Sequence, residues 1–163
     1  MNFSYQPQLQ LQHQLVRLRV LLGGDKGTKV ISLNGPANCV VKAAADSRFE
    51  SLALRMFEMT VADARLEGLT LAGGRKGLLN PTTGATTYGT VLMSSSGAIV
   101  TNCVIRDVQP TGRQFSSIQI SSSKGLVTHC KVTACTTGET NEIGVFMLSD
   151  GVVDNCLIDA NKK

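Results

Sequence analysis

A phrase of similar sequence occurs three times in this chain. It reads SSSGAIVTNCVIRDV at residues 94–108, SSSKGLVTHCKVTAC at 121–135 and LSDGVVDNCLIDAN at 148–161. Its cysteine recurs after 27 residues from Cys103 to Cys130 and after 26 residues from Cys130 to Cys156. The apolar triplets before it, VLM at 91, IQI at 118 and VFM at 145, keep a spacing of 27. Repeats of about 20 to 50 residues are typical of solenoids, in which each unit buries its apolar face against the next. The sequence therefore predicts stacked coils.

Composition narrows the class of this repeat. The 163 residues suit one domain, 42% of them are hydrophobic, and only 4% are aromatic. Gly, Ser, Thr and Val are prominent, which favours short strands and turns over long helices. The formal charge of +4 comes from scattered Lys and Arg, so we expect no nucleic-acid partner. No apolar run reaches the roughly 18 residues of a membrane span, and the N-terminus lacks the order of a signal peptide.

Alternation and turn residues divide the chain into segments. Residues 1–27 are expected to form an atypical N-terminal arm or cap, in which LVRLRV at 15–20 alternates as a strand does. Residues 28–163 are expected to form the coils, truncated at the C-terminal end because no capping segment follows the last repeat. Residues 46–56 are left open between a short helix and a loop. ARLEGLTLAGG at 64–74 is expected to be one alternating strand of an earlier coil, with Leu69 in the cysteine position. Segments 75–89, 109–116 and 136–144 are rich in Gly, Thr, Pro and Asn and are expected to be loops.

Side chains of a strand point alternately to its two sides, so the repeats align into columns. The columns expected to point inward are Val91, Ile118 and Val145; Met93, Ile120 and Met147; Val100, Val127 and Val153; and Ile105, Val132 and Ile158. The columns expected to point outward are Leu92, Gln119 and Phe146; Val104, Lys131 and Leu157; and Arg106, Thr133 and Asp159.

The five cysteines follow the repeat and not the spacing of a metal site. None forms a CxxC or a Cys/His motif, so we predict no metal site. Strands about 4.8 Å apart would allow either disulfides or a column of reduced core thiols at the shared coil position, and we favour the thiols. The residues just before the cysteines are expected to lie at a bend and to hydrogen-bond along the stack, a role that we prefer to catalysis for the histidine. The predicted structural ladder is Asn102, Cys103, His129, Cys130, Asn155 and Cys156.

These phrases resemble a known family. GAIVTNCVIRDV, GLVTHCKVTAC and GVVDNCLIDAN, preceded by SLNGPANCVV at 32–41 and by ARLEGLTLAGG, are similar to the tandem coils of bacterial right-handed parallel β-helix proteins of the pectin-lyase-like superfamily. The likeness covers residues 28–161. It implies an all-β fold, a right-handed parallel β-helix with coils of about 26–27 residues, and right-handed crossovers are also the general expectation for parallel strands. Because such relatives are usually exported, the resemblance implies an extracellular or cell-surface location, which the missing signal peptide leaves open.

Many relatives act on polysaccharides, and such chemistry needs clustered carboxylates. Arg106 and Asp159 share one outward column two coils apart, and Lys131 lies on a neighbouring column in the coil between them. This is the best polar patch, but no coil offers two adjacent outward carboxylates. An outward threonine lattice of the ice-binding kind is set aside, because an aspartate at 154 follows the threonines at 101 and 128.

We therefore predict a non-catalytic β-helix scaffold for surface display or adhesion. Polysaccharide is its expected partner, with Arg106, Lys131 and Asp159 as candidate ligand contacts, and we expect no cofactor. The alternative is a fragment of a polysaccharide lyase or glycoside hydrolase whose catalytic coils are missing or poorly marked. The open strand edge of a last coil also predicts end-to-end self-association.

Overall fold

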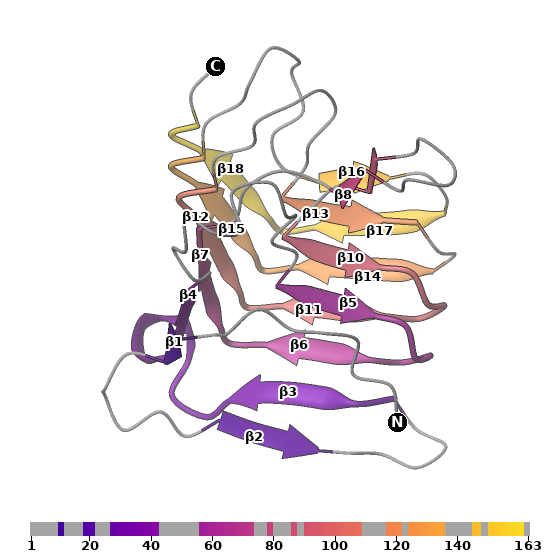
Figure 1. The fold of residues 1–163 in the computed structure, drawn as a ribbon, viewed down its shortest axis with the longest axis horizontal. Helices are drawn as coiled ribbons and strands as arrows, with labels where there is room; N and C mark the ends of the chain where they lie inside the picture. Colours follow the sequence, from indigo (N-terminus) through magenta and orange to yellow (C-terminus); the bar gives the residue numbers. More distant parts are fainter. Residues whose placement is uncertain are drawn as a thin grey trace.

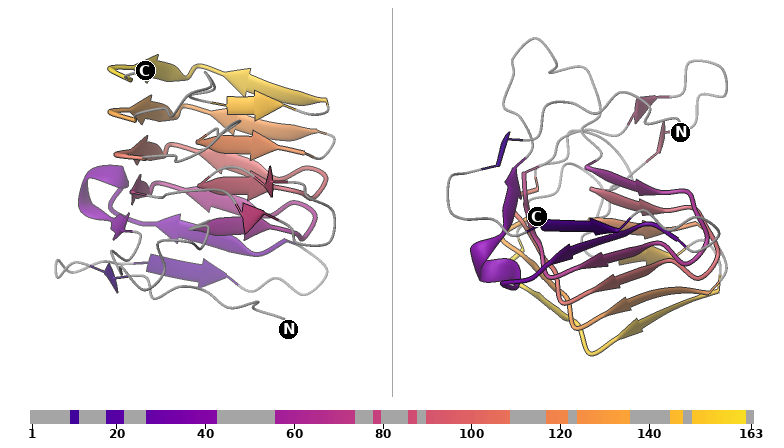
Figure 2. Two further views of the ribbon diagram at one scale, coloured as in Figure 1. Left: turned by 45° about the horizontal axis from the view of Figure 1, so that its top comes forward. Right: turned by 90° about the horizontal axis from the view of Figure 1, so that it is seen from below.

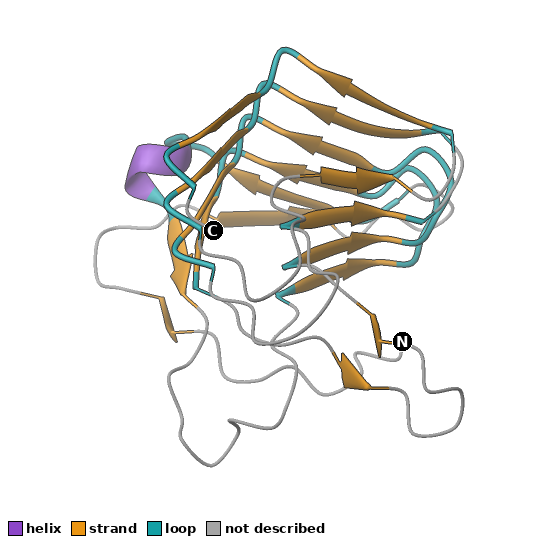
Figure 3. Ribbon diagram, turned by 90° about the horizontal axis from the view of Figure 1, so that it is seen from above, coloured by secondary structure: helices purple, strands orange, loops and turns teal. Residues whose placement is uncertain are grey.

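The computed structural model describes residues 10–11, 18–21, 27–42, 56–73, 78–79, 86–87, 90–108, 117–121, 124–135, 145–147 and 150–161. These residues form stacked coils whose strands lie in three parallel-stranded walls around a common interior (Figure 1, Figure 2 and Figure 3). The predicted parallel β-helix is confirmed.

Each wall is a sheet with one strand from each successive coil. Sheet A has the order β1 (Gln10–Leu11), β4 (Val40–Lys42), β7 (Thr70–Ala72), β12 (Val104–Arg106), β15 (Lys131–Thr133) and β18 (Leu157–Asp159). Sheet B has the order β2 (Leu18–Leu21), β3 (Lys29–Ser32), β6 (Arg65–Glu67), β11 (Ile99–Thr101), β14 (Gly125–Thr128) and β17 (Gly151–Asp154). Sheet C has the order β5 (Phe57–Met59), β10 (Val91–Met93), β13 (Ile118–Ile120) and β16 (Val145–Met147).

Three short elements of the described residues lie outside these sheets. A 3₁₀ turn, η1 (Pro36–Asn38), links β3 to β4. Within the predicted loop 75–89, β8 (Leu78–Leu79) pairs antiparallel with β9 (Thr86–Thr87), so that segment contains strands that its turn-rich composition did not suggest. The helix or loop left open at 46–55 lies outside the described residues.

The interior is made of the predicted inward columns. Ile105 aligns with Leu71 below it and Val132 above it, and all three have at most 1% of their surface exposed. Val100 and Val127 align in sheet B and are fully buried. Alternation along each short strand therefore correctly separates the core from the outer face in the middle coils.

The outer column of sheet C is also covered. Leu92 and Gln119 each have only 6% of their surface exposed, although both lie between inward neighbours. Alternation gives the direction of a side chain, but other parts of a chain can still cover the face to which it points. The third member of this column, Phe146, has a side chain outside the description.

From the second coil on, the corner between sheets B and A is two residues long. Gly68, Asn102, His129 and Asn155 occupy its first position with φ of 70°, 50°, 53° and 47°. This left-handed conformation turns the chain, and Gly and Asn tolerate it better than most residues do. The single strand predicted over 64–74 is therefore wrong. It is two strands, β6 and β7, in different walls, because the backbone at Gly68 turns out of the first wall.

The first coil is covered at its N-terminal side by antiparallel strands. β2 pairs with β3, with Leu18 opposite Ser32, and β1 pairs with β4, with Gln10 opposite Lys42. All pairings between successive coils are parallel, so these two are the antiparallel additions to the large sheets. The two ends of the stack therefore differ in structure, as the side view of Figure 2 shows.

Candidate functional site

The predicted ligand-contact residues lie on the outer face of sheet A. Arg106, Thr133 and Asp159 are aligned partners on β12, β15 and β18, which places them in one column along the stack. Lys131 stands on the adjacent column, two residues before Thr133 on β15. The inward residues of β12 and β15 are buried in the core, so the backbone that carries Arg106 and Thr133 is fixed by packing.

Two ion pairs divide the charges on this face. The ammonium of Lys131 lies 3.3 Å from Oδ2 of Asp159, which joins two successive coils. The guanidinium of Arg106 pairs instead with Asp107, its neighbour in sequence. Arg106 and Asp159 are thus in one column, as predicted, but they pair with different partners and Thr133 stands between them.

The carboxyl of Asp159 is held in its ionised form. Hydrogen bonding by Thr133 lowers the pKa of Asp159 most, and the hydrogen bond and charge of Lys131 lower it further. A carboxyl with a lowered pKa carries its negative charge at neutral pH and does not supply a proton to a leaving group. The arrangement keeps Asp159 charged and does not suit it to general acid catalysis.

A second polar column lies on the outer face of sheet B. Glu67, Thr101, Thr128 and Asp154 are aligned on β6, β11, β14 and β17. The hydroxyl of Thr128 is 2.8 Å from Nδ1 of His129 and 3.4 Å from Oδ2 of Asp154. Sequence reasoning placed His129 in the corner ladder and did not join it to Asp154. The recurrence of Thr101 and Thr128 one repeat apart is the signal that locates this column.

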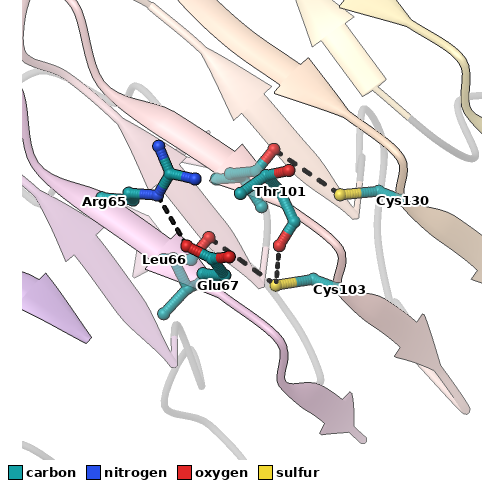
Figure 4. A network of polar contacts seen from close by, with 7 residues as sticks. Arg65, Leu66, Glu67, Thr101, Cys103 and Cys130 are labelled. Carbon is teal, nitrogen blue, oxygen red and sulfur yellow. Dashed lines mark hydrogen bonds and ion pairs between the residues drawn. The ribbon is translucent and has the colours of Figure 1, made fainter. Parts of the chain in front are cut away.

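On the same face, Nε of Arg65 donates to Oε2 of Glu67 over 2.7 Å, as Figure 4 shows beside the core thiols. Both side chains are about one-third exposed, at 36% and 31%. The lower part of this column is therefore already occupied by an internal ion pair.

The cysteine column lies inside the stack. All five cysteines are free thiols, and Cys103 and Cys130 are buried one coil apart. Each of these two buried thiols contacts two main-chain carbonyls: Cys103 Sγ lies 3.2 Å from the oxygen of Thr101 and 3.8 Å from that of Leu66 (Figure 4). Cys130 Sγ repeats this pattern: it lies 3.3 Å from the oxygen of Thr128 and 3.6 Å from that of Val100 in the preceding coil.

The ionisation of four of the five thiols is disfavoured, whereas the hydrogen bond with Cys130 lowers the pKa of Cys103. The hydrogen bond with the Cys103 thiol raises the pKa of Cys130, and burial raises it further. Burial also raises the pKa of Cys39, Cys135 and Cys156. Because the thiolate is the reactive form, the four thiols with a raised pKa are suited to packing between coils. Leu69 takes the position of the cysteine in the second coil. Its main-chain oxygen accepts a hydrogen bond from Val104 N over 2.8 Å, just as the main-chain oxygen of Cys103 accepts one from Lys131 N.

The corner residues before the cysteines are exposed. Asn102, His129 and Asn155 share the left-handed conformation described above, and their main chains continue the stack: Asn102 N donates to the oxygen of Thr128 over 3.2 Å. Across the described part of the chain, no group of three or more His, Cys, Asp or Glu side chains could hold a metal ion. Nor does any helix among those residues have the length and apolar character of a membrane span.

Comparison with known proteins identifies the repeat. The model of a family described as the right handed beta helix region matches residues 64–163, which begin just before β6 and include the last coil. Neither the curated proteins nor the solved structures gave a match.

Proposed function

Because this chain belongs to the right-handed β-helix family, we propose that it is a non-catalytic scaffold that binds carbohydrate on the outer face of sheet A, for surface display or adhesion. One observation supports the proposal most. Arg106, Thr133 and Asp159 repeat a polar side chain from coil to coil on a wall whose opposite face is packed core.

The chemistry of this face suits a sugar chain. Sugar hydroxyls both donate and accept hydrogen bonds, and the column offers a guanidinium donor, a hydroxyl and a carboxylate acceptor. Successive coils are about 4.8 Å apart, so a polymer laid along the stack would meet the three side chains in turn. An acidic polysaccharide could also use the positive charges of Arg106 and Lys131.

The ion pairs leave the site available to a ligand. The side chains of Lys131 and Asp159 are 43% and 39% exposed, and that of Arg106 is 40% exposed. Exposed ion pairs contribute little to stability, because water already solvates both partners. A sugar hydroxyl can therefore join or replace these contacts at small cost.

The alternative is a fragment of a polysaccharide lyase or glycoside hydrolase. A glycosidase uses two carboxyl groups about 5 to 9.5 Å apart, one of them protonated to act as the acid. On sheet A, Asp159 has a lowered pKa and pairs with Lys131, while Asp107 pairs with Arg106. These contacts favour binding over catalysis at this face. Binding of an external polysaccharide also places the proposed action at the cell surface or outside the cell.

The test is a screen of the purified chain against a glycan array that includes acidic polysaccharides, with turnover measured on every ligand that binds. Arg106→Ala and Asp159→Ala are expected to weaken binding by about tenfold or more each, since each removes a charged contact. Asp154→Ala, which removes an exposed carboxylate from the neighbouring sheet B, is the matched control and is expected to bind as the wild type does.

The outcomes separate the two functions. Binding without turnover, lost in the two sheet A variants alone, supports the proposal. Turnover that is lost in both variants favours the enzyme. Equal binding by all three variants, with circular dichroism showing that they are folded, would place any ligand on another face and contradict the site.

A further inference from the structure

The last coil presents core side chains to solvent. Met147, Val153 and Ile158 are 48%, 37% and 48% exposed. Their counterparts in the preceding coil are at most 1% exposed: Ile120, Val127 and Val132. These three apolar side chains, together with the half-buried Cys156, form what we call the end face of the stack.

Among the described residues, no further strand pairs with the backbone at the end face. β16, β17 and β18 are the terminal strands of sheets C, B and A in the described part of the chain. A terminal strand carries a row of main-chain N–H and C=O groups that can pair with another strand. Apolar side chains and backbone groups therefore face the same direction, along the axis of the stack.

The opposite end differs. There β2 and β1 cover the edges of β3 and β4, and both pair antiparallel. A second copy stacked head to tail would have to displace these strands from sheets A and B. A second copy placed tail to tail would not. Its edge strands would run antiparallel to those of the first copy, which is the kind of addition that the edge of β3 already accepts.

We propose that the end face of the 163-residue chain binds the end face of a second copy, giving a twofold symmetric, tail-to-tail dimer. The contact is isologous, because the same surface is used by both copies, and it closes at two. It would extend the parallel sheets of each copy through an antiparallel junction and bury Met147, Val153 and Ile158 of both.

The size of the end face predicts a weak dimer. Strand rise and the spacing of facing sheets give it a cross-section of roughly 400 Å² per copy. Stable complexes bury about 800 Å² per partner, and smaller contacts are transient. We therefore expect a dissociation constant in the micromolar range, about 1 to 100 μM.

Sedimentation velocity over a range of concentrations tests this proposal. The wild type is expected to pass from monomer to dimer, while Val153→Lys and Ile158→Lys weaken the dimer by about tenfold or more, because each buries a charge in the junction. The matched controls are Val152→Lys and Leu157→Lys. They alter the neighbouring residues of the same strands, which are 56% and 52% exposed on the outer faces, and they are expected to dimerise as the wild type does.

A second measurement needs no substitution. Cys156 lies on the end face, whereas the other four cysteines are buried, so early reaction with a thiol reagent reports on Cys156. Its reaction is expected to slow by about twofold when the chain concentration reaches the dissociation constant, and further above it. A wild type that stays monomeric at about 100 μM overturns the proposal and leaves the end face to another occupant. Growth beyond a dimer, equal dissociation of the Val152→Lys control, or Cys156 labelling independent of concentration overturns it as well.

Discussion

Ile105 and Ile158 occupy the same column of sheet A but differ in what surrounds them. Ile105 is fully buried between Leu71 and Val132, whereas Ile158 in the last coil is 48% exposed. Replacing either with Ala removes the same side-chain atoms, so any difference in stability reflects the coil and not the chemistry. We expect Ile105→Ala to be the more destabilising by about 2.5 kcal/mol.

The magnitude follows from burial. Burial contributes about 0.8 kcal/mol per methylene, and Ile→Ala removes the equivalent of three, so the transfer part is about 2.4 kcal/mol at Ile105. A cavity closed on both sides by neighbouring coils adds to this and gives a total of about 3.5 kcal/mol. At Ile158 about half of the transfer part applies and no closed cavity forms, which leaves about 1 kcal/mol.

Urea denaturation followed by circular dichroism measures both variants. The experiment is run at low chain concentration, so that burial of Ile158 in a dimer does not add to its contribution. The midpoint of Ile105→Ala should then fall well below that of Ile158→Ala at an unchanged m-value. Equal losses of stability within about 0.5 kcal/mol would refute the reasoning, because they would mean that coil-on-coil packing does not determine the contribution of this column.

Three further experiments test local features. Thr133→Val should raise the pKa of Asp159, as measured by carbon-detected NMR titration. Because the pKa of Asp159 is lowered in the folded chain, its carboxylate stabilises the fold above the unfolded-state pKa, and this contribution is lost as the pH falls through the folded-state pKa. The variant should therefore lose less stability in acid than the wild type does. Gly27→Ala should cost more stability than Gly35→Ala, by about 1 kcal/mol or more, because an added Cβ at Gly27 would meet backbone atoms at 2.3 Å, whereas nothing lies within 4 Å at Gly35; equal thermal shifts would contradict this. Asn102→Ala should be less stable than Asn102→Gly by about 1 kcal/mol, since φ is 50° there, and reversed melting temperatures would show that the side chain and not the backbone governs the corner.

The repeat spacing predicts most of the fold. What could not be predicted is what depends on backbone angles, which spacing and hydropathy do not specify. A fixed repeat spacing aligns Val100 with Val127 and Ile105 with Val132 without any knowledge of their contacts, so the core columns could be predicted from the repeat length alone. The corner does not follow from hydropathy, because the turn at Gly68 depends on a backbone angle. Pattern alone therefore read two strands as one at 64–74.

The charged face shows the same limit. The column that contains Arg106 and Asp159 is a consequence of register and was predictable. The choice of ion-pair partners was not, because a long side chain reaches several neighbours and local geometry selects among them. Arg106 forms its ion pair with Asp107, and Lys131 forms one with Asp159; the repeat spacing specifies neither choice.

The constant register of the coils has a further consequence. Lys131 aligns with Val104, and each follows a cysteine at the same corner. Removing residues 104–130 would join Cys103 directly to Lys131 and leave each wall one strand shorter, with every inward residue still above an inward residue. The coil is thus an interchangeable part, and gene duplication or an engineer can change the reach of the molecule in whole steps of about 4.8 Å without redesigning its joints.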